Sequence, residues 1–365
     1  MRSGTFEMIE LIKKNSSVLG KKRITIGFDG YVDEIVRPVK LKEIGNISYY
    51  NTIAEFSHRI MNSKDSACEI EIIPDMIKLG GNAPLMANAT ANLGIKTSVI
   101  GAFGFPQLNP YFKELAEKLD LYSIADPAKT NALEFHDGKI MFGNNDNLNK
   151  VNWENIKSII GIERLTSLIE ESHIFSAVNW SSLYHLDGIL KGIKQDIVDK
   201  SKSLSPDVNY AFFDLADPTK RSSSEIDAGL NIMCSFRNKY RLVFSFNENE
   251  ARRINRYYFD DTEDVFRIAE NLYSLLNPHI LILRPNQFAI LLEDGKITTT
   301  DGFHVEKPRL STGGGDNFDA GFCTGLLMGL PSETSLYMAR ACASYYIKYG
   351  NSPSLTELLN YMENE

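Results

Sequence analysis

The stretch "RLSTGGGDNFDAGF" (residues 309–322) places three successive glycines directly before Asp316. Apolar residues then recur at positions 318, 322, 326 and 327, and this spacing predicts an α-helix over residues 317–328. The glycines therefore precede a helix N-terminus, where unpaired amide groups and the helix dipole favour an anion. Because glycine has no side chain to obstruct a close approach, the triplet predicts a cradle for a phosphate-like group.

Asp316 is the unexpected member of this stretch, because its carboxylate is repelled by a neighbouring phosphate. A carboxylate is useful there if a metal ion lies between the two charges, or if it accepts the proton of an attacking hydroxyl group. The alternative is structural: Asp316 caps the helix, and the glycines form a plain turn. The common phosphate loops offer no further explanation, since the sequence contains no GxxxxGK[ST] and no GxGxxG after an expected strand.

Length and composition are those of a globular protein. The chain has 365 residues, of which 43% are apolar and 24% charged, enough for one large α/β domain. The net charge of −8 and the lack of basic runs argue against a nucleic-acid partner. The four cysteines form no CxxC pair, and we expect reduced thiols. The N-terminus lacks a secretory pattern and no run suits a membrane span, so we expect a cytoplasmic protein.

Apolar runs rich in β-branched and aromatic residues alternate with helix-length segments over most of the chain. Such alternation is typical of a mainly parallel sheet with helices on both faces, so we expect a doubly wound α/β fold. Ligands of these sheets bind beyond the carboxyl ends of the strands. The expected strands are 23–28, 69–74, 97–103, 173–178, 210–215, 241–246 and 279–283. The expected helices are 83–93, 155–171, 181–203, 223–239 and 262–276.

Two segments interrupt the alternation with hairpin signals. Residues 132–143 flank Asp137-Gly138, and residues 289–299 flank a second "DG" pair. We expect the first hairpin to form a small β lid around residues 130–145, mobile or in contact with a second copy of the chain. Without repeats or an evident linker, we expect a single domain over 1–365 that includes this lid and an N-terminal helical extension, residues 1–20.

The opening stretch resembles the C-terminal signature of the ribokinase family (PfkB-type carbohydrate kinases), commonly D-T-x-G-A-G-D-x-F-x-A-G-F. The resemblance implies that the amides of Gly313, Gly314 and Gly315 form an anion hole for the transferring phosphoryl group. It also implies that Asp316 is the base that deprotonates the substrate hydroxyl. The matching positions are Ser311, Gly313, Gly315, Asp316, Phe318, Ala320, Gly321 and Phe322.

Two further segments resemble the sugar side of the family site. "LGGNAPLMANATANLG" (residues 79–94) is similar to the N-terminal signature, a Gly-Gly turn that opens a helix ending in Leu-Gly. "GFDGYVDEI" (residues 27–35) follows the first strand, where the family places an aspartate on the sugar hydroxyls. The resemblance implies these sugar-binding residues: Asp29, Asp33, Gly80, Gly81 and Asn82.

The metal and nucleotide side rests on shorter motifs. "FNENEARRI" (residues 246–254) contains Asn247-x-x-Glu250, which resembles the N-x-x-E motif that organises Mg²⁺, its waters and the nucleotide. The alternative for Asn247 and Glu250 is a helix cap and its partner. "DLADPTKR" (residues 214–221) implies phosphate contacts by Lys220 and Arg221, and the alternative is a solvated helix start.

Some positions depart from the family pattern. Leu310 replaces the aspartate that usually opens the C-terminal signature, and Leu85 stands where many members carry an asparagine facing the sugar. "LRPNQFA" (residues 283–289) replaces the usual T-x-G-x-x-G on the nucleotide side. There Arg284 compensates as a phosphate contact or is a plain surface residue.

The resemblance implies a Mg²⁺-dependent kinase that transfers the γ-phosphoryl group of ATP to a hydroxyl group of a sugar. Two alternatives share the fold, an ADP-dependent sugar kinase and a nucleoside kinase. A third alternative is a non-catalytic relative that binds a sugar or nucleotide. Retention of Asp316, Asn247 and Glu250 together argues against this last alternative, since a sensor needs no base.

Overall fold

The computed structural model describes residues 3–301, 303, 305–306, 308–310 and 312–365. Its centre is a nine-stranded sheet in which the strands from β6 to β12 run parallel and β13 and β14 form an antiparallel edge. In spatial order, the strands are β14 (Lys296–Thr300), β13 (Ala289–Glu293), β12 (Ile280–Arg284), β11 (Arg241–Asn247), β10 (Tyr210–Asp214), β9 (Ile174–Ala177), β1 (Arg23–Gly27), β5 (Lys96–Ala102) and β6 (Asp120–Ala125). The expected doubly wound α/β fold is confirmed.

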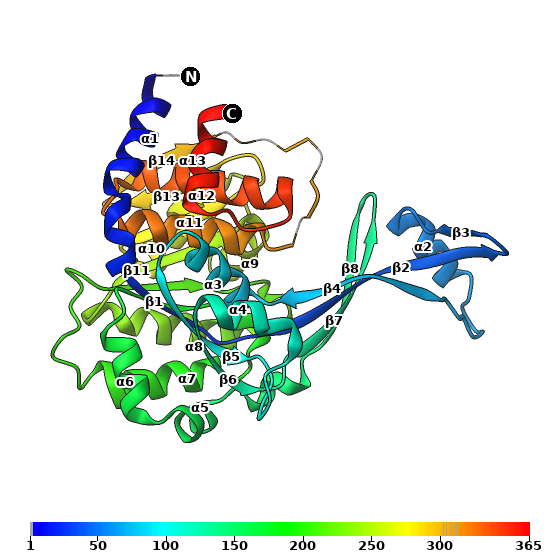
Figure 1. The fold of residues 1–365 in the computed structure, drawn as a ribbon, viewed down its shortest axis with the longest axis horizontal. Coiled ribbons are helices and arrows are strands. Elements are labelled where there is room, and N and C mark those ends of the chain that lie inside the picture. The colour runs from blue at the N-terminus through cyan, green and yellow to red at the C-terminus, as the bar shows by residue number, and fades with distance from the viewer. Residues whose placement is uncertain (1–2, 302, 304, 307, 311) are drawn as a thin grey trace.

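Helices cover both faces of this sheet and enclose two separate apolar cores (Figure 1). One face carries α5 (Trp153–Ile160), α6 (Ile162–Glu170), α7 (Leu186–Ile193), α8 (Ser223–Cys234), α9 (Glu248–Tyr258) and α10 (Val265–Leu276). The other carries α1 (Ser3–Asn15), α3 (Asn82–Asn92), α4 (Lys113–Lys118), α11 (Gly314–Leu327), α12 (Ser332–Tyr349) and α13 (Leu355–Asn364). The N-terminal extension is therefore part of the main body, since α1 packs beside α13.

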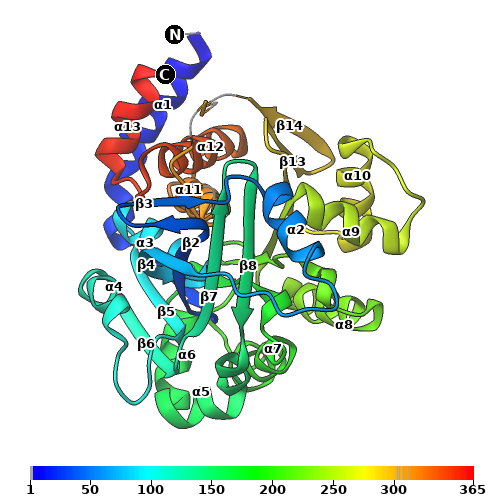
Figure 2. The ribbon, with the colours of Figure 1, turned by 90° about the vertical axis from the view of Figure 1, so that its right-hand side faces the viewer.

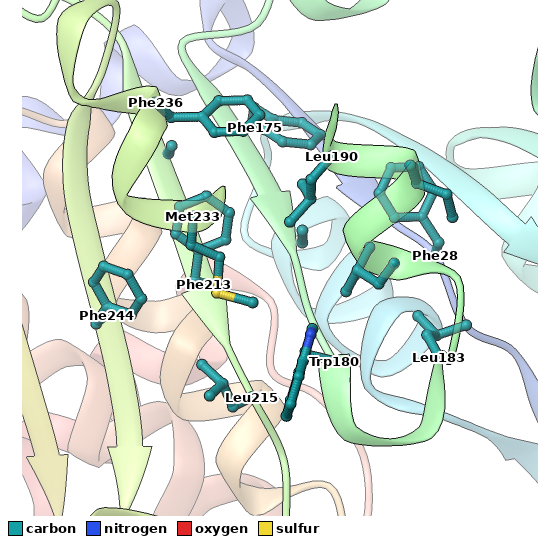
Figure 3. Packing of buried hydrophobic residues seen from close by; sticks show 14 of the residues in the cluster. Phe28, Phe175, Trp180, Leu183, Leu190, Phe213, Leu215, Met233, Phe236 and Phe244 are labelled. Atoms are coloured by element: carbon teal, nitrogen blue, oxygen red, sulfur yellow. The ribbon is translucent and has the colours of Figure 1, made fainter. Parts of the chain in front are cut away.

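Alternation of side chains along the central strands explains the two cores. In β10, Phe212 faces one core while Phe213 faces the other. Figure 3 shows the aromatic side of this arrangement, where the ring of Phe236 packs against those of Phe175 and Phe213. Because helices cover both faces of the central strands, a ligand reaches polar groups of this sheet at the carboxyl ends of the strands.

A second, five-stranded sheet projects from the body as a lid (Figures 1 and 2). It consists of β2 (Tyr31–Glu43), β3 (Asn46–Tyr49), β4 (Ile72–Gly80), β7 (Ala128–Phe135) and β8 (Gly138–Asn144). Helix α2 (Ile53–Met61) covers its outer side, where Phe56 packs with Val36 and Leu133. The expected hairpin at 132–143 is present as β7 and β8, and it is one part of a larger lid.

Several expected elements have different bounds. The expected strand 69–74 is wrong for the main sheet, since β4 begins at Ile72 and pairs antiparallel with β2 in the lid. Its apolar side chains Met76 and Ile77 are exposed, whereas a strand of the main sheet would be buried on both faces. The expected helix 155–171 is two helices, because Gly161 adopts φ 85°, a left-handed conformation that favours glycine. The expected helix 181–203 begins only at Leu186.

Within the residues that the structure describes, no helix combines the length and the apolar character that crossing a membrane requires.

Candidate active site

The glycine triplet lies at the start of α11, as the sequence predicts. Gly313 is the N-cap residue, with φ 98° in the left-handed region. A Cβ atom at Gly313 would lie 2.8 Å from the Tyr346 hydroxyl oxygen, and a Cβ atom at Gly315 would lie 2.9 Å from Nη1 of Arg284. The first amides of an α-helix have no carbonyl partner within the helix. Glycine is therefore needed for the local conformation and the packing, and the turn presents its amides at a helix N-terminus.

Asp316 lies at the third helical position rather than at the cap, so the alternative that it caps α11 is wrong. Its side chain is largely buried yet lines a cavity. Burial, followed by the charges of Asp214 and Asp319, raises the pKa of Asp316 well above its ordinary value. A buried carboxyl group with a raised pKa that faces a cavity is the kind of group that accepts or donates protons in catalysis.

A buried ion-pair network lies directly beneath this turn. Arg284, at the end of β12, contacts Asp214 at the end of β10 (Nη2–Oδ2 2.8 Å) and Asp319 on α11 (Nη1–Oδ2 3.1 Å). The same Nη1 donates to the carbonyl oxygen of Gly315 at 3.0 Å, and Ser245 donates to Asp319 at 2.7 Å. Burial alone would lower the pKa of Arg284, but the two carboxylates outweigh it and raise the pKa. Arg284 is thus a cation that fixes the glycine turn.

Asn247 and Glu250 form a capping box at the start of α9. The Glu250 amide donates to the Asn247 side chain at 2.9 Å, and the Asn247 amide donates to Glu250 Oε2 at 2.9 Å. The cap that we considered as the alternative is therefore present, and the metal role stays a prediction. Burial, together with the charge of Asp214, raises the pKa of Glu250 to about 8. The neighbouring carboxylates therefore repel one another at this strand end, and a bound cation would reduce this repulsion.

The oxygen-rich surroundings of Glu250 fit the Mg²⁺ that the resemblance implies. Asp214 and Asp217 both act on the titration of Glu250, so three carboxylates gather near these strand ends. Mg²⁺ prefers oxygen ligands and is usually held by one or two carboxylates, with waters and substrate phosphates completing its shell. Within the described ranges, no group of three or more His, Cys, Asp or Glu residues is arranged to hold a metal ion by itself. The donors therefore suit an ion that arrives with a nucleotide.

The two aspartates expected on the sugar side have different environments. Asp29 is fully buried and accepts hydrogen bonds from the amides of Asn82 (2.9 Å) and Ala83 (2.7 Å) and from Nδ2 of Asn179 (2.6 Å). It thereby caps α3, and burial raises its pKa to about 6. Asp33 lies on the lid strand β2 and lines the cavity. The geometry favours Asp33 as the residue that meets a ligand and Asp29 as the residue that orients the loop.

The Gly-Gly turn accommodates both aspartates. A Cβ atom at Gly80 would lie 2.2 Å from Asp33 Oδ2, and a Cβ atom at Gly81 would lie 3.0 Å from Asp29 Oδ2. Gly81 also has φ +99°, which disfavours other residues. These glycines therefore let two carboxylates approach the start of α3, and Asn82 is left facing the cavity.

The cavity has a volume of about 290 Å³ and lies where the lid meets the carboxyl ends of the main strands. It brings together the predicted residues Asp33, Gly81, Asn82, Lys220 and Asp316. Leu85, at the position where many family members carry a sugar-facing asparagine, also lines the cavity. The other lining residues are Tyr31, Thr130, Met141, Gly143, Asn145, Asn179, Ser181, Ser182, Ala216, Asp217 and Thr312. Its size is close to the lower end for small-molecule sites, which suits a compact polar ligand.

Lys220 and Arg221 have different environments in the structure. Lys220 is exposed and lines the cavity. Arg221 is buried between the rings of Trp180 and Tyr184, and it donates to the backbone carbonyl groups of Trp180 and Leu183 at 2.9 Å each. The phosphate role of Arg221 stays a prediction, and this geometry favours a structural role. Ser311, one of the positions that match the family signature, lies outside the described residues.

Comparison with known proteins assigns the family. The family model described as prokaryotic ketohexokinase matches residues 9–364. A ketohexokinase of Haloferax volcanii is 26% identical over 339 residues, which cover 92% of this chain and 89% of that protein.

Solved structures share the fold at lower identity. The adenosine kinase of Sinorhizobium meliloti superposes with a TM-score of 0.67 at 18% identity, covering 94% of this chain and 98% of that one. Arabidopsis thaliana ribokinase, solved with ribose and ATP, gives a TM-score of 0.65 at 15% identity with the same coverage. The family match, the fold and the cavity agree: the chain belongs to the prokaryotic ketohexokinase family, and it is a sugar kinase with the ribokinase fold.

Proposed function

We propose that this protein transfers the γ-phosphoryl group of ATP to a hydroxyl group of a ketohexose, with Mg²⁺ bound alongside the nucleotide. The family and the Haloferax volcanii relative support a ketose substrate. The observation that carries the mechanism is the position of Asp316. Its carboxyl group lines the sugar-side cavity and directly follows the glycine turn at the α11 N-terminus.

The chemistry assigned to the chain is proton removal and charge stabilisation. Asp316 accepts the proton of the sugar hydroxyl as its oxygen forms a bond to the γ-phosphorus, and the bond to the leaving ADP breaks. The amides of Gly313, Gly314 and Gly315 donate to the phosphoryl oxygens, where the helix N-terminus stabilises negative charge. Asp33 and Asn82 hold the sugar in the cavity. Such positioning and electrostatic stabilisation supply most of the catalysis in phosphoryl transfer.

Asn247 and Glu250 would hold Mg²⁺ through its waters. Together with Asp214 and Asp217 they would place a divalent cation beside the phosphates, where its positive charge would offset the like charges of these carboxylates. Lys220 is exposed and lines the cavity, which supports assigning it to the phosphate chain. Arg284 contributes indirectly, because it orients Gly315 through its carbonyl group.

A second cavity, of about 470 Å³, suits the nucleoside part of ATP. It is lined by Asn286 and Gln287 of the loop after β12 and by α12 residues that include Ala343 and Ile347. Ile347 also lies against the glycine turn, since a Cβ atom at Gly314 would be 3.0 Å from its Cδ1. A nucleotide seated there reaches the turn with its phosphates. The unusual loop sequence at 283–289 keeps ADP open as an alternative donor.

We also propose a cytoplasmic location, where ATP is available and the four free cysteines stay reduced.

The assembly we propose is a homodimer formed through the lid. Exposed apolar side chains gather on it: Leu41, Ile44, Ile47, Ile60, Met61, Ile72, Met76, Ile77, Met141 and Phe142. Successive strand residues such as Met141 and Phe142 point to opposite faces, so this exposed apolar surface lies on both faces of the lid, and a second copy of the chain would cover one of them.

The substitution Asp316→Asn tests the proposed base. Asparagine keeps the shape but accepts no proton, so kcat should fall by about 10²–10⁴-fold while sugar and nucleotide still raise the melting temperature. The control is Asp264→Asn at the N-cap of α10, where asparagine caps as well as aspartate and activity should be unchanged. Near-normal kcat in Asp316→Asn would remove the assigned mechanism.

Glu250→Gln tests the metal role separately from the cap. Glutamine also serves in a capping box, so the fold should be retained, but the Mg²⁺ concentration at half-maximal turnover should rise. The matched control is Glu357→Gln in the capping box of α13, which should leave Mg²⁺ dependence unchanged. If both variants show wild-type Mg²⁺ dependence, Glu250 only caps α9.

The dimer is tested by sedimentation velocity at micromolar concentration. Wild-type protein should sediment as a dimer, and Leu41→Asp on β2 should shift it towards monomer because a charge is then buried in the interface. Val208→Asp, at an exposed apolar position on the body, is the control and should remain dimeric. A wild-type protein that sediments as a monomer contradicts the proposed dimer.

A further inference from the structure

The cavity-facing side of the lid carries charged residues in addition to Asp33, the proposed sugar contact. Asp33 on β2 lies opposite Lys78 on β4 and Thr130 on β7, and Glu134 on β7 lies opposite Lys139 on β8. Directly opposed residues share one face of a sheet, and positions 130 and 134 on β7 also share a face. Because Asp33 and Thr130 line the cavity, this is the lid's inner face.

Lys139 connects this inner face to the glycine turn. Its ammonium group donates a hydrogen bond to the Thr312 hydroxyl, 173 residues away in the chain. Thr312 lines the cavity and immediately precedes Gly313, the N-cap residue of α11. The lid thus brings a cation to the side of the turn that is open to the cavity, whereas Arg284 lies beneath the turn.

On the body side of the glycine turn, the acidic side chains outnumber the basic ones. On the body side, Asp214, Asp316 and Asp319 face one arginine, which is already engaged by two of them. A transferring phosphoryl group adds further negative charge at this point. Burial lowers the pKa of Lys139, and the charge of Lys78 adds to this shift, while Glu134 and Asp33 oppose it. A partly buried ammonium group interacts more strongly with an anion than one in open water does.

We propose that Lys139 is a catalytic residue that contacts the transferring phosphoryl group when the lid is closed over the sugar. This proposal rests on the proposed kinase function and adds the lid to its machinery. Lys139 keeps its protons throughout: it releases Thr312 and donates N–H bonds to the phosphoryl oxygens as the bond to ADP breaks and the bond to the sugar forms. Because Asp33 lies on the same face, sugar binding and delivery of the cation are coupled through one rigid sheet.

The test is Lys139→Met, which keeps most of the side-chain length but removes the charge. Loss of one donor to a developing oxyanion typically costs about 10²–10³-fold in kcat, and we expect that range here. Sugar KM should change by only a few-fold, and Lys139→Arg should recover part of kcat. In a second measurement, affinity for ADP with aluminium fluoride and sugar should fall while affinity for ADP alone is retained.

The matched control is Lys129→Met on β7, an exposed lysine that lies opposite Val32 and one residue before the inner-face residue Thr130. It should leave kcat unchanged. If Lys139→Met has wild-type kcat, or raises sugar KM alone, the lysine only closes the lid and the proposal is overturned. Lys139→Gln with a wild-type melting temperature guards against misfolding of the methionine variant. A wild-type protein that phosphorylates no sugar contradicts the proposed function instead.

Discussion

The buried guanidinium group of Arg284 is the constraint on which the site depends. It is taken out of water at the end of β12 and is stabilised by Asp214 from β10 and Asp319 from α11. A buried charge is tolerated only when it is paired and hydrogen-bonded, and loss of one partner costs about 3–5 kcal/mol. The network therefore ties the start of α11 to the strand ends. Through its bond to Gly315, it sets where the glycine amides and Asp316 lie.

The main body of the protein and the lid meet at this network. The main sheet is packed between two apolar cores, so the positions of its strand ends are fixed. Asp214, Asn247 and Arg284 mark the ends of three neighbouring strands. The lid has its own small core around Val36, Phe56 and Leu133. From outside the main sheet it brings Asp33 and Thr130 to the cavity and Lys139 to the hydroxyl group of Thr312. The proposed phosphoryl transfer is thereby assigned to the junction of the main body and the projecting lid.

Most of the main sheet could be predicted from local sequence, because each central strand is a largely continuous apolar run. The start of α11 could also be predicted, because it follows a glycine triplet. The lid was underestimated because its pairing is long-range. Nothing within residues 69–80 indicates that β4 pairs with β2, and half-exposed Met76 resembles a residue of a buried strand. Residues of the same type also make different contacts in the fold, which the sequence does not indicate. Asp29 and Asp33 are equivalent in the sequence, but only Asp29 meets the amides of α3. Arg221 likewise finds Trp180 and Tyr184, which no local pattern signals.

The most direct test of the account is a turnover measurement with purified wild-type protein, Mg²⁺ and a matrix of donors and acceptors. The acceptors are a ketohexose, an aldohexose, a pentose and a nucleoside, each combined with ATP or with ADP, and the phosphorylated product is detected by mass spectrometry. The account predicts phosphorylation of the ketohexose with ATP at a kcat/KM above that of every other pair. Phosphorylation of the nucleoside in preference to the ketohexose, turnover with ADP in place of ATP, or no phosphorylated product would contradict it.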